Sequence, residues 1–406
     1  MRERARAAAI AELAAARAAS DEVFARCAPA AMHARPIRER HRLVFYLGHL
    51  EAFDANLLRH GVEIASPRPA WDRLFERGID PVGPEAALPT DEPGDWPPID
   101  EIRAYGRAMR AAIDRAIERS ELSGELLDAA IEHRWMHVET LAYLLHQLPL
   151  GSVTPVAQPS VPSSAPLARR SIEIPRGVAT LGRDDGGGWD NERGIVRVDV
   201  PAFAIASHPV TNGDYLAFVE AGGEAPRFWR RTARGWFLRR FTDEIALPLD
   251  APVYVSHAEA SAYARSRGAR LPTEAEWHRA AYGTPGDHER AYPWGDVAPD
   301  PTRGNFDLAR DDSVSVAAHP AGASGFGVHD LIGNGWEWTS TLFAPLPGFA
   351  AASYYPGYSA DFFDGAHYVM KGGSPRTAAR LLRRSFRNWF QPHYPYVYAT
   401  LRLVEV

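Results

Sequence analysis

The first 148 residues contain segments of helix length in which apolar and polar positions are mixed. Four such segments lie near residues 4–27, 37–60, 99–119 and 123–147, and a stretch dense in Pro and Asp separates the second from the third. The Ala, Leu and Ile positions of the first segment are those of an ordinary helix. The pattern predicts an N-terminal bundle of four helices.

A change of composition marks the end of the helical part. The stretch GSVTPVAQPSVPSSAPLA, residues 151–168, is rich in Pro, Ser and Ala and carries no charge, which is typical of an extended linker without a core of its own. We therefore expect a helical domain at 1–150, this linker at 151–168, and a second domain at 169–406.

Beyond the linker the apolar residues fall into short runs that predict strands. SIEIP, RVDVPAFAIAS and HYVMKGGS are separated by Gly, Pro, Asn and Asp, and Trp and Tyr become frequent. Helices are expected near 211–220 and 256–267 and within TEAEWHRAAYG. Short elements joined by many long loops indicate an irregular α+β domain.

Charge and cysteine content exclude several classes of function. The chain has 45 basic and 51 acidic residues, a net charge of −6, so composition favours neither nucleic acid nor an anionic membrane as a partner. The single cysteine, Cys27, excludes an internal disulfide framework and any zinc site with two or more thiolates. No run of about 18 apolar residues is present, and we expect a soluble, cytoplasmic protein.

The segment IEHRWMHVE contains a histidine pair suited to binding a metal. His133 and His137 are four residues apart in a predicted helix, so both rings project from one face with their Cβ atoms about 5–6 Å apart. Two neutral imidazoles on adjacent turns can share one divalent ion if a third ligand is supplied from elsewhere. Such pairs also occur by chance on helix surfaces.

His49 is the expected third ligand. It lies in an otherwise apolar stretch, FYLGHLEAF, where an imidazole without a partner would cost about 1–3 kcal/mol. The second and fourth helices of an antiparallel bundle can face each other across the core. Three neutral ligands leave open positions on the ion, an arrangement that suits iron(II) as well as zinc.

Motifs spread over nearly the whole chain resemble those of the sulfoxide synthases of ergothioneine biosynthesis. They are LGH, His133-x3-His137-x-Glu139, the Pro-rich linker, and, in the second half, PVTNGDYLAF, RLPTEAEWHRAA, YPWGD, GNGWEWTS, KGGSPRT and SFRNW. The resemblance implies a DinB-like four-helix domain joined to a domain of the formylglycine-generating-enzyme type, which itself resembles a C-type lectin fold. It also implies that His49, His133 and His137 hold Fe(2+), and that a thiol is coupled to C2 of the imidazole of hercynine (trimethylhistidine) with dioxygen.

Some of these motifs are better explained by structure than by catalysis. GNGWEWTS and RLPTEAEW are expected to supply buried tryptophans and carboxylates that tie loops together. The formylglycine-generating enzymes use a copper-binding cysteine pair, and because no cysteine follows Cys27, that activity is excluded.

Two departures from the family bear on the donor of the chalcogen atom. Sulfoxide synthases commonly have a glutamine where this chain has Met136, and those that use γ-glutamylcysteine have an aspartate where it has Phe390. A cationic amino group prefers a carboxylate partner, whereas Phe390 offers an aromatic face. The stretch FYLGHLEAFDANLL resembles selenoneine synthase more closely, and that resemblance implies a selenosugar as the donor.

The resemblance also implies further substrate-binding and catalytic residues. Asn388 and Trp389 would bind the carboxylate and the trimethylammonium group of hercynine. Arg387 would hold a carboxylate or sugar hydroxyls, although alternating basic residues on a strand often only face solvent. The catalytic candidates are three tyrosines that would give a proton or an electron to dioxygen: Tyr354, Tyr355 and Tyr358.

Other functions remain open on the sequence alone. The donor could be cysteine or γ-glutamylcysteine, as in the sulfur enzymes. The helical domain could instead be a zinc or nickel hydrolase or thiol transferase of the DinB type. The lectin-like half could be a binding module without catalytic activity.

Overall fold

The computed structural model describes residues 2–76, 90–119, 123–161 and 168–406. The chain divides into two compact units: residues 1–155 together with 352–357, and residues 156–351 together with 358–406. The first is called the helical unit below and the second the loop-rich unit. No helix among the described residues is long and apolar enough to cross a membrane.

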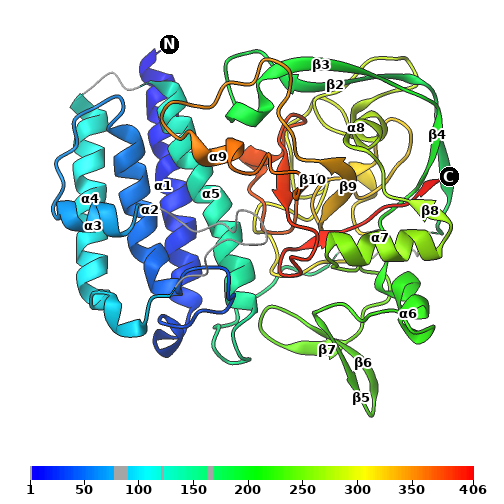
Figure 1. Ribbon diagram of the computed structural model, residues 1–406, viewed down its shortest axis with the longest axis horizontal. Helices are drawn as coiled ribbons and strands as arrows, with labels where there is room; N and C mark the ends of the chain where they lie inside the picture. Colours follow the sequence, from blue (N-terminus) through cyan, green and yellow to red (C-terminus); the bar gives the residue numbers. More distant parts are fainter. Residues whose placement is uncertain (1, 77–89, 120–122, 162–167) are drawn as a thin grey trace. The chain divides into compact units, whose positions relative to one another are not determined.

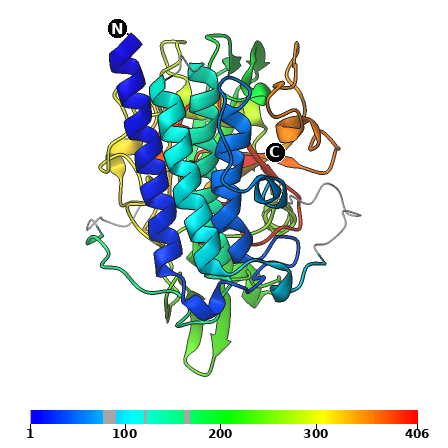
Figure 2. The ribbon, with the colours of Figure 1, turned by 90° about the vertical axis from the view of Figure 1, so that its left-hand side faces the viewer.

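Four long helices form the core of the helical unit and run alongside one another (Figures 1 and 2). They are α1 (Arg2–Arg26), α2 (Leu43–Leu58), α4 (Ile99–Arg119) and α5 (Gly124–His146). Helix α1 packs on α5, and α2 packs on both α4 and α5. The predicted four-helix bundle is therefore confirmed, and α2 and α5 are neighbours.

Two local predictions in this unit were wrong. Helix α2 begins at Leu43 instead of near residue 37, because the chain folds back and the Leu43 and Val44 N–H groups donate to the carbonyls of Ala34 and Met32. The stretch after α2 is more than a loop, since a short helix, α3 (Pro69–Leu74), begins with Pro at a first-turn position where Pro is well tolerated.

The described part of the predicted linker is held along its length. The Ala28 N–H donates to the Ser152 carbonyl, and the Thr154 N–H donates to the Arg26 carbonyl within the helical unit. Further on, the Gln158 side chain accepts a hydrogen bond from the Asp311 N–H in the loop-rich unit. Residues 162–167 lie outside the described residues.

The loop-rich unit is built from short strands in several small sheets (Figure 1). The first has the order β1 (Ser171–Ile174), β4 (Phe203–Ala206), β13 (Val404–Glu405) and β8 (Ala269–Arg270). The second has the order β11 (Asn388–Phe390), β10 (Tyr368–Lys371), β9 (Trp336–Leu342) and β12 (Ala399–Thr400). Two antiparallel groups complete the set: β2 (Gly177–Arg183) with β3 (Gly194–Val200), and β5 (Trp229–Thr232), β6 (Gly235–Arg239) and β7 (Glu244–Ala246).

The helices of this unit are short, and three begin with a side-chain cap. They are α6 (Asn212–Glu220), α7 (His257–Ser266), α8 (Glu274–Tyr282) and α9 (Gly357–Ala360). The caps of α6, α7 and α8 are the side chains of Thr211, Ser256 and Thr273, each followed three residues later by an acidic residue that completes a capping box. The three predicted helices and the irregular α+β fold are confirmed.

Buried polar bonds hold the core of the loop-rich unit together. Trp277 Nε1 donates to Glu337 Oε2 at 2.9 Å, and the buried Arg402 forms an ion pair with the same carboxylate, with 2.6 Å between Nη2 and Oε1. Trp338 Nε1 donates to the Val255 carbonyl at 2.9 Å. The tryptophans and acidic residues of RLPTEAEW and GNGWEWTS thus tie distant loops together, as the sequence indicated.

Candidate metal centre

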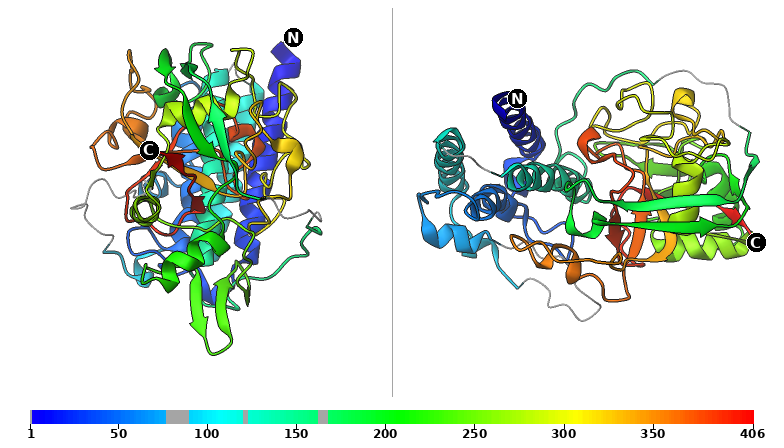
Figure 3. Two further views of the ribbon diagram at one scale, coloured as in Figure 1. Left: turned by 90° about the vertical axis from the view of Figure 1, so that its right-hand side faces the viewer. Right: turned by 90° about the horizontal axis from the view of Figure 1, so that it is seen from above.

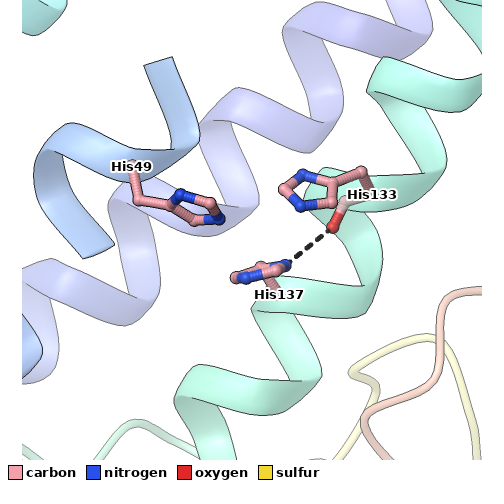
Figure 4. A group of neighbouring side chains, drawn as sticks. All are labelled: His49, His133 and His137. Atoms are coloured by element: carbon pink, nitrogen blue, oxygen red, sulfur yellow. Dashed lines mark hydrogen bonds between the residues drawn. The ribbon is translucent and has the colours of Figure 1, made fainter. Parts of the chain in front are cut away.

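Three histidines from two helices converge inside the helical unit (Figure 4). His49 comes from α2, and His133 and His137 come from adjacent turns of α5. One nitrogen of each ring can be chosen so that all three lie within 4.8 Å of one another. The right-hand view of Figure 3 shows these helices nearly end-on, with α2 beside α5.

Burial keeps the three rings neutral. His49 and His133 are only 2% and 3% exposed. Burial lowers the pKa of His49 to about 4 and lowers the pKa values of His133 and His137 well below the ordinary value. Each ring therefore keeps a lone pair at neutral pH, as a metal ligand must.

Backbone carbonyls orient two of the three rings. His49 Nδ1 donates to the Phe75 carbonyl oxygen at 2.8 Å, and His137 Nδ1 donates to the His133 carbonyl oxygen at 3.2 Å. Because a carbonyl can only accept, both rings carry their proton on Nδ1 and keep the Nε2 lone pair free. His133 Nδ1 is buried and has no hydrogen-bond partner among the described residues.

Aromatic rings surround the histidines. Phe53 stacks on His133, with 3.4 Å between ring centroids and 10° between planes. Tyr355 belongs to the helical unit and has its ring 5.1 Å from Phe53 and 6.5 Å from His133. Tyr46 lies 5.9 Å from His137. The side chains nearest the histidines are therefore mostly aromatic.

A buried ionic group connects α2 to α5 close in sequence to the histidines. Arg134, which is 0% exposed, donates to Asp54 Oδ2 at 2.6 Å, to Glu51 Oε2 at 3.0 Å and to the Leu50 carbonyl at 2.9 Å. Burial alone would raise the pKa of Glu51, but the Arg134 and Arg110 guanidinium groups outweigh burial and hold that pKa at about 2. The group thereby sets the register between the two helices that carry the ligands.

The donor set fits a divalent transition metal. Three neutral imidazoles are typical ligands of iron, zinc, copper or nickel, whereas calcium and magnesium prefer oxygen. Three protein ligands also leave coordination positions for substrates. We therefore assign His49, His133 and His137 as the residues that would hold the ion.

The sequence missed the residues that support these ligands. Glu51, Asp54 and Arg134 could have been found, because charged residues inside apolar helical stretches must have buried partners. Phe75 gave no signal, since its hydrogen bond to His49 is made by a backbone carbonyl, a group that no residue type marks in the sequence.

The remaining site residues predicted from the sequence are divided between the two units. Met136 adjoins His137 on α5, and Tyr354 and Tyr355 also belong to the helical unit. The residues of SFRNWF and Tyr358 belong to the loop-rich unit, in which Tyr358 stacks on Trp189 with 4.0 Å between ring centroids.

Within the loop-rich unit, strand β11 carries three predicted substrate residues. Trp389 stacks on Phe343, with 4.1 Å between centroids, and Phe390 stacks on Tyr394 at 5.0 Å. The Asn388 side-chain oxygen accepts a hydrogen bond from the Trp389 N–H at 2.9 Å.

The arginines of the same segment do not simply face solvent. Arg387 is buried, donates to Glu274 Oε1 at 3.0 Å and to the Ala344 carbonyl at 3.0 Å. Arg383 donates to the buried Glu192 at 2.7 Å. The alternative that Arg387 only faces solvent was therefore wrong, because its guanidinium forms an ion pair with the buried Glu274.

Comparison with known proteins matches both parts of the chain to protein families. Residues 158–405 match the family described as sulfatase-modifying factor enzyme 1-like domain, and residues 12–147 match the DinB superfamily. A hercynine oxygenase of Mycolicibacterium thermoresistibile is 34% identical over 396 residues, which cover 89% of this chain and 86% of that protein. A hercynine oxygenase of Mycobacterium tuberculosis is 34% identical over 392 residues, covering 89% and 90% of the two chains.

A formylglycine-generating enzyme of Mycobacterium tuberculosis is 32% identical over 214 residues, but these cover only 39% of this chain and 69% of that enzyme. The long matches therefore include the helical part that carries the three histidines, and the short one does not extend over the whole chain. This chain belongs to the hercynine oxygenase family and combines a DinB-type helical domain with a domain of the sulfatase-modifying factor type.

Proposed function

We propose that this protein is an iron(II)-dependent oxygenase that joins a chalcogen atom to C2 of the imidazole ring of hercynine. The observation that carries the proposal is the buried group of three neutral histidines in a chain that matches hercynine oxygenases over nearly its whole length. A site for structural zinc would need four protein ligands, whereas three leave room for substrates.

The reaction balances with dioxygen as the oxidant. The C2–H bond of hercynine and the S–H or Se–H bond of the donor break, and a carbon–chalcogen bond forms. One oxygen atom of dioxygen is retained on the chalcogen and the other leaves as water. When bound, iron(II) would supply open coordination positions and the redox chemistry that this four-electron reduction of dioxygen requires.

The chain's own residues would position the substrates and supply a proton. We assign the proton to Tyr355, because its ring lies near His133 and Phe53. Phe53 shields one face of His133 from water. Trp389 would provide an aromatic surface for the trimethylammonium group, and Asn388 an amide for the carboxylate.

We further propose a selenosugar as the donor. Phe390 and Met136 stand where the sulfur enzymes commonly have an aspartate and a glutamine, so the groups that would bind a charged amino acid are replaced by an aromatic ring and a thioether. A neutral sugar does not need the missing carboxylate. The finding that favours a thiol donor instead is the similarity to hercynine oxygenases.

Oxygen uptake distinguishes these donors. Protein loaded anaerobically with iron(II) would be supplied with hercynine and, in separate reactions, a selenosugar, cysteine or γ-glutamylcysteine. We expect uptake coupled to loss of the hercynine C2 proton with the selenosugar, none with His137→Ala, and unchanged uptake with His60→Ala, an exposed histidine just beyond α2.

Other results of the oxygen-uptake experiment would change the proposal. Uptake only with a thiol would overturn the selenium assignment and leave the oxygenase intact. Absence of uptake with every donor, although iron binds, would overturn the oxygenase. Stoichiometric zinc or nickel with hydrolase or transferase activity would favour the other DinB-type functions.

A further inference from the structure

We propose that Gly48 and Phe75 are positioning residues that determine which nitrogen His49 offers to the metal. The inference rests on the proposed metal centre and deepens it. It assigns a role to the glycine of the LGH motif, which neither donates nor accepts through a side chain. The mechanism is steric: Gly48 leaves space for the Phe75 ring, and the Phe75 backbone carbonyl then holds His49.

A hydrogen bond to the Phe75 carbonyl orients the ring of His49. The Phe75 carbonyl oxygen lies 2.8 Å from His49 Nδ1 and can only accept, so the proton stays on Nδ1 and Nε2 keeps its lone pair. His137 is oriented from within its own helix, by the carbonyl of His133. His49 depends instead on a residue that follows α3, 26 positions further along the chain.

The Phe75 ring occupies the space that a side chain at position 48 would need. A Cβ atom added to Gly48 would lie 2.4 Å from Cδ2 and 2.5 Å from Cγ of Phe75, far inside contact distance. The Phe75 ring therefore sits directly against the α2 backbone. Other helical glycines of this unit lack such a constraint: a Cβ at Gly106 would lie 3.3 Å from Glu51 Cγ, and one at Gly124 would meet nothing within 4 Å.

The Phe75 ring also packs against Trp96. The Phe75 ring is 0% exposed and stacks on Trp96, with 5.9 Å between centroids and 21° between planes. Trp96 Nε1 donates to Asp91 Oδ2 at 2.8 Å, and Arg42 Nε donates to the same oxygen at 3.1 Å. The Phe75 ring thus contacts both the α2 backbone and an anchored tryptophan, and we infer that these two contacts fix the direction of the Phe75 carbonyl.

Steric displacement of Phe75 should consequently alter the tautomer of His49 as well as metal binding. In Gly48→Ala the methyl group would push the ring outward and draw the carbonyl away from Nδ1. An imidazole released from its outer partner can rotate or protonate on Nε2, and loss of such a partner typically lowers metal affinity about 10- to 100-fold.

The first test needs no metal. Nitrogen-15 NMR spectra of the apoprotein report which imidazole nitrogen carries the proton, and the His49 signals are assigned by their loss in His49→Gln. We expect the Nδ1–H tautomer in the wild type and in the control Gly124→Ala. We expect this tautomer to be lost or mixed in Gly48→Ala.

The second test measures binding of Co²⁺ by its visible absorption bands. We expect a 10- to 100-fold weaker affinity for Gly48→Ala and less than a twofold change for Gly124→Ala. Phe75→Leu should weaken binding as well, and the double variant Gly48→Ala/Phe75→Leu should be no weaker than Phe75→Leu alone, because the methyl then occupies freed space. If Gly48→Ala does not fold, the Phe75→Leu and double variants carry the comparison.

A folded Gly48→Ala protein with wild-type tautomer and wild-type affinity would overturn the inference. So would additive losses in the double variant, since additivity would mean that the two residues act independently. Failure of the wild type to bind Co²⁺ would instead overturn the metal centre, and the tautomer measurement would still decide the role of Gly48.

Discussion

Tyr355 illustrates how a single residue can be selected from several equivalent candidates. The three tyrosines of SYYPGYS could not be ranked from the sequence, because loop residues have no periodicity that shows which side chains point inward. The structure distinguishes two of them: the Tyr355 ring contacts Phe53 and lies near His133, while the Tyr358 ring stacks on Trp189 in the loop-rich unit.

Replacing Tyr355 by Phe should lower kcat at least tenfold, because the ring stays in place while the transferable proton is removed. Co²⁺ affinity should change less than twofold, since Tyr355 is not a ligand. Steady-state oxygen uptake and Co²⁺ titration check the two expectations. Tyr354→Phe and Tyr358→Phe serve as controls, and a larger loss in either of them would move the role to that tyrosine.

The buried carboxyl group of Asp330 should make the stability of the protein depend on pH. Burial raises the pKa of Asp330 to about 7, although Asn334 donates a hydrogen bond to it at 2.8 Å. The folded protein therefore holds this proton more tightly than the unfolded chain, whose aspartate has a pKa near 3.8. The stabilising contribution is complete below about pH 4 and is lost as the pH rises to about 7.

The substitution Asp330→Asn should remove the loss of stability that occurs as the pH rises from about 4 to about 7. Asparagine suits the left-handed conformation at position 330, where φ is 55°, and its side-chain oxygen can still accept from Asn334. The gain in unfolding free energy should be small at pH 4 and reach at most about 4 kcal/mol at pH 8, by the factor of 1.36 kcal/mol per pKa unit. Urea unfolding at both pH values measures it, and an equal effect at both would contradict the assignment.

At the scale of elements, Arg134 connects α2 to α5. Removing one partner of a buried ion pair leaves uncompensated charges and typically costs about 3–5 kcal/mol, whereas an exposed pair contributes about 0–1 kcal/mol. Arg134→Met should therefore lower the unfolding free energy of the helical unit by about 3–5 kcal/mol. The control Arg68→Met removes an exposed pair with Glu101 and should cost less than about 1 kcal/mol.

Helix-specific circular dichroism during urea unfolding checks this comparison. Similar losses in both variants would show that the buried group does not determine how α2 and α5 pair. Weaker Co²⁺ binding by folded Arg134→Met is also expected, because His49 and His133 lie on the two helices that Arg134 connects.

Some helices and their boundaries could be predicted from the sequence and others could not. The four long helices and the capped helices α6, α7 and α8 were predictable, since their signals are local. The late start of α2 and the helix α3 were not, because the first depends on hydrogen bonds to Ala34 and Met32 and the second has only six residues. The supporting role of Phe75 was not predictable either, since nothing at its own position encodes the contact.

For the whole molecule, metal binding should appear as a stability effect confined to one unit. An ion that binds only the folded state at 100 times its Kd adds about 2.7 kcal/mol to the unfolding free energy. Scanning calorimetry of the wild type should show a transition that Co²⁺ raises and a chelator lowers. His49→Ala should abolish the shift, and a shift that persists in this variant would place the ion elsewhere.

The three histidines could be identified from the sequence, but the groups that orient their rings could not. Spacing on α5 and an imidazole in an apolar stretch were sufficient to name His49, His133 and His137. The donor and acceptor residues in the loop-rich unit were named from resemblance alone and stay predictions, because recognition of a substrate depends on distances that spacing does not encode.

The burial of Cys27 has a consequence for the proposed reaction with a thiol or selenol. Its side chain is only 6% exposed, and burial raises its pKa to about 11, so almost none of it is ionised at neutral pH. Exchange with oxidised low-molecular-weight substrates requires an accessible thiolate. We therefore expect Cys27 not to form mixed disulfides or selenosulfides with oxidised thiols or selenols, and to remain unreactive toward thiol-specific reagents until the protein unfolds.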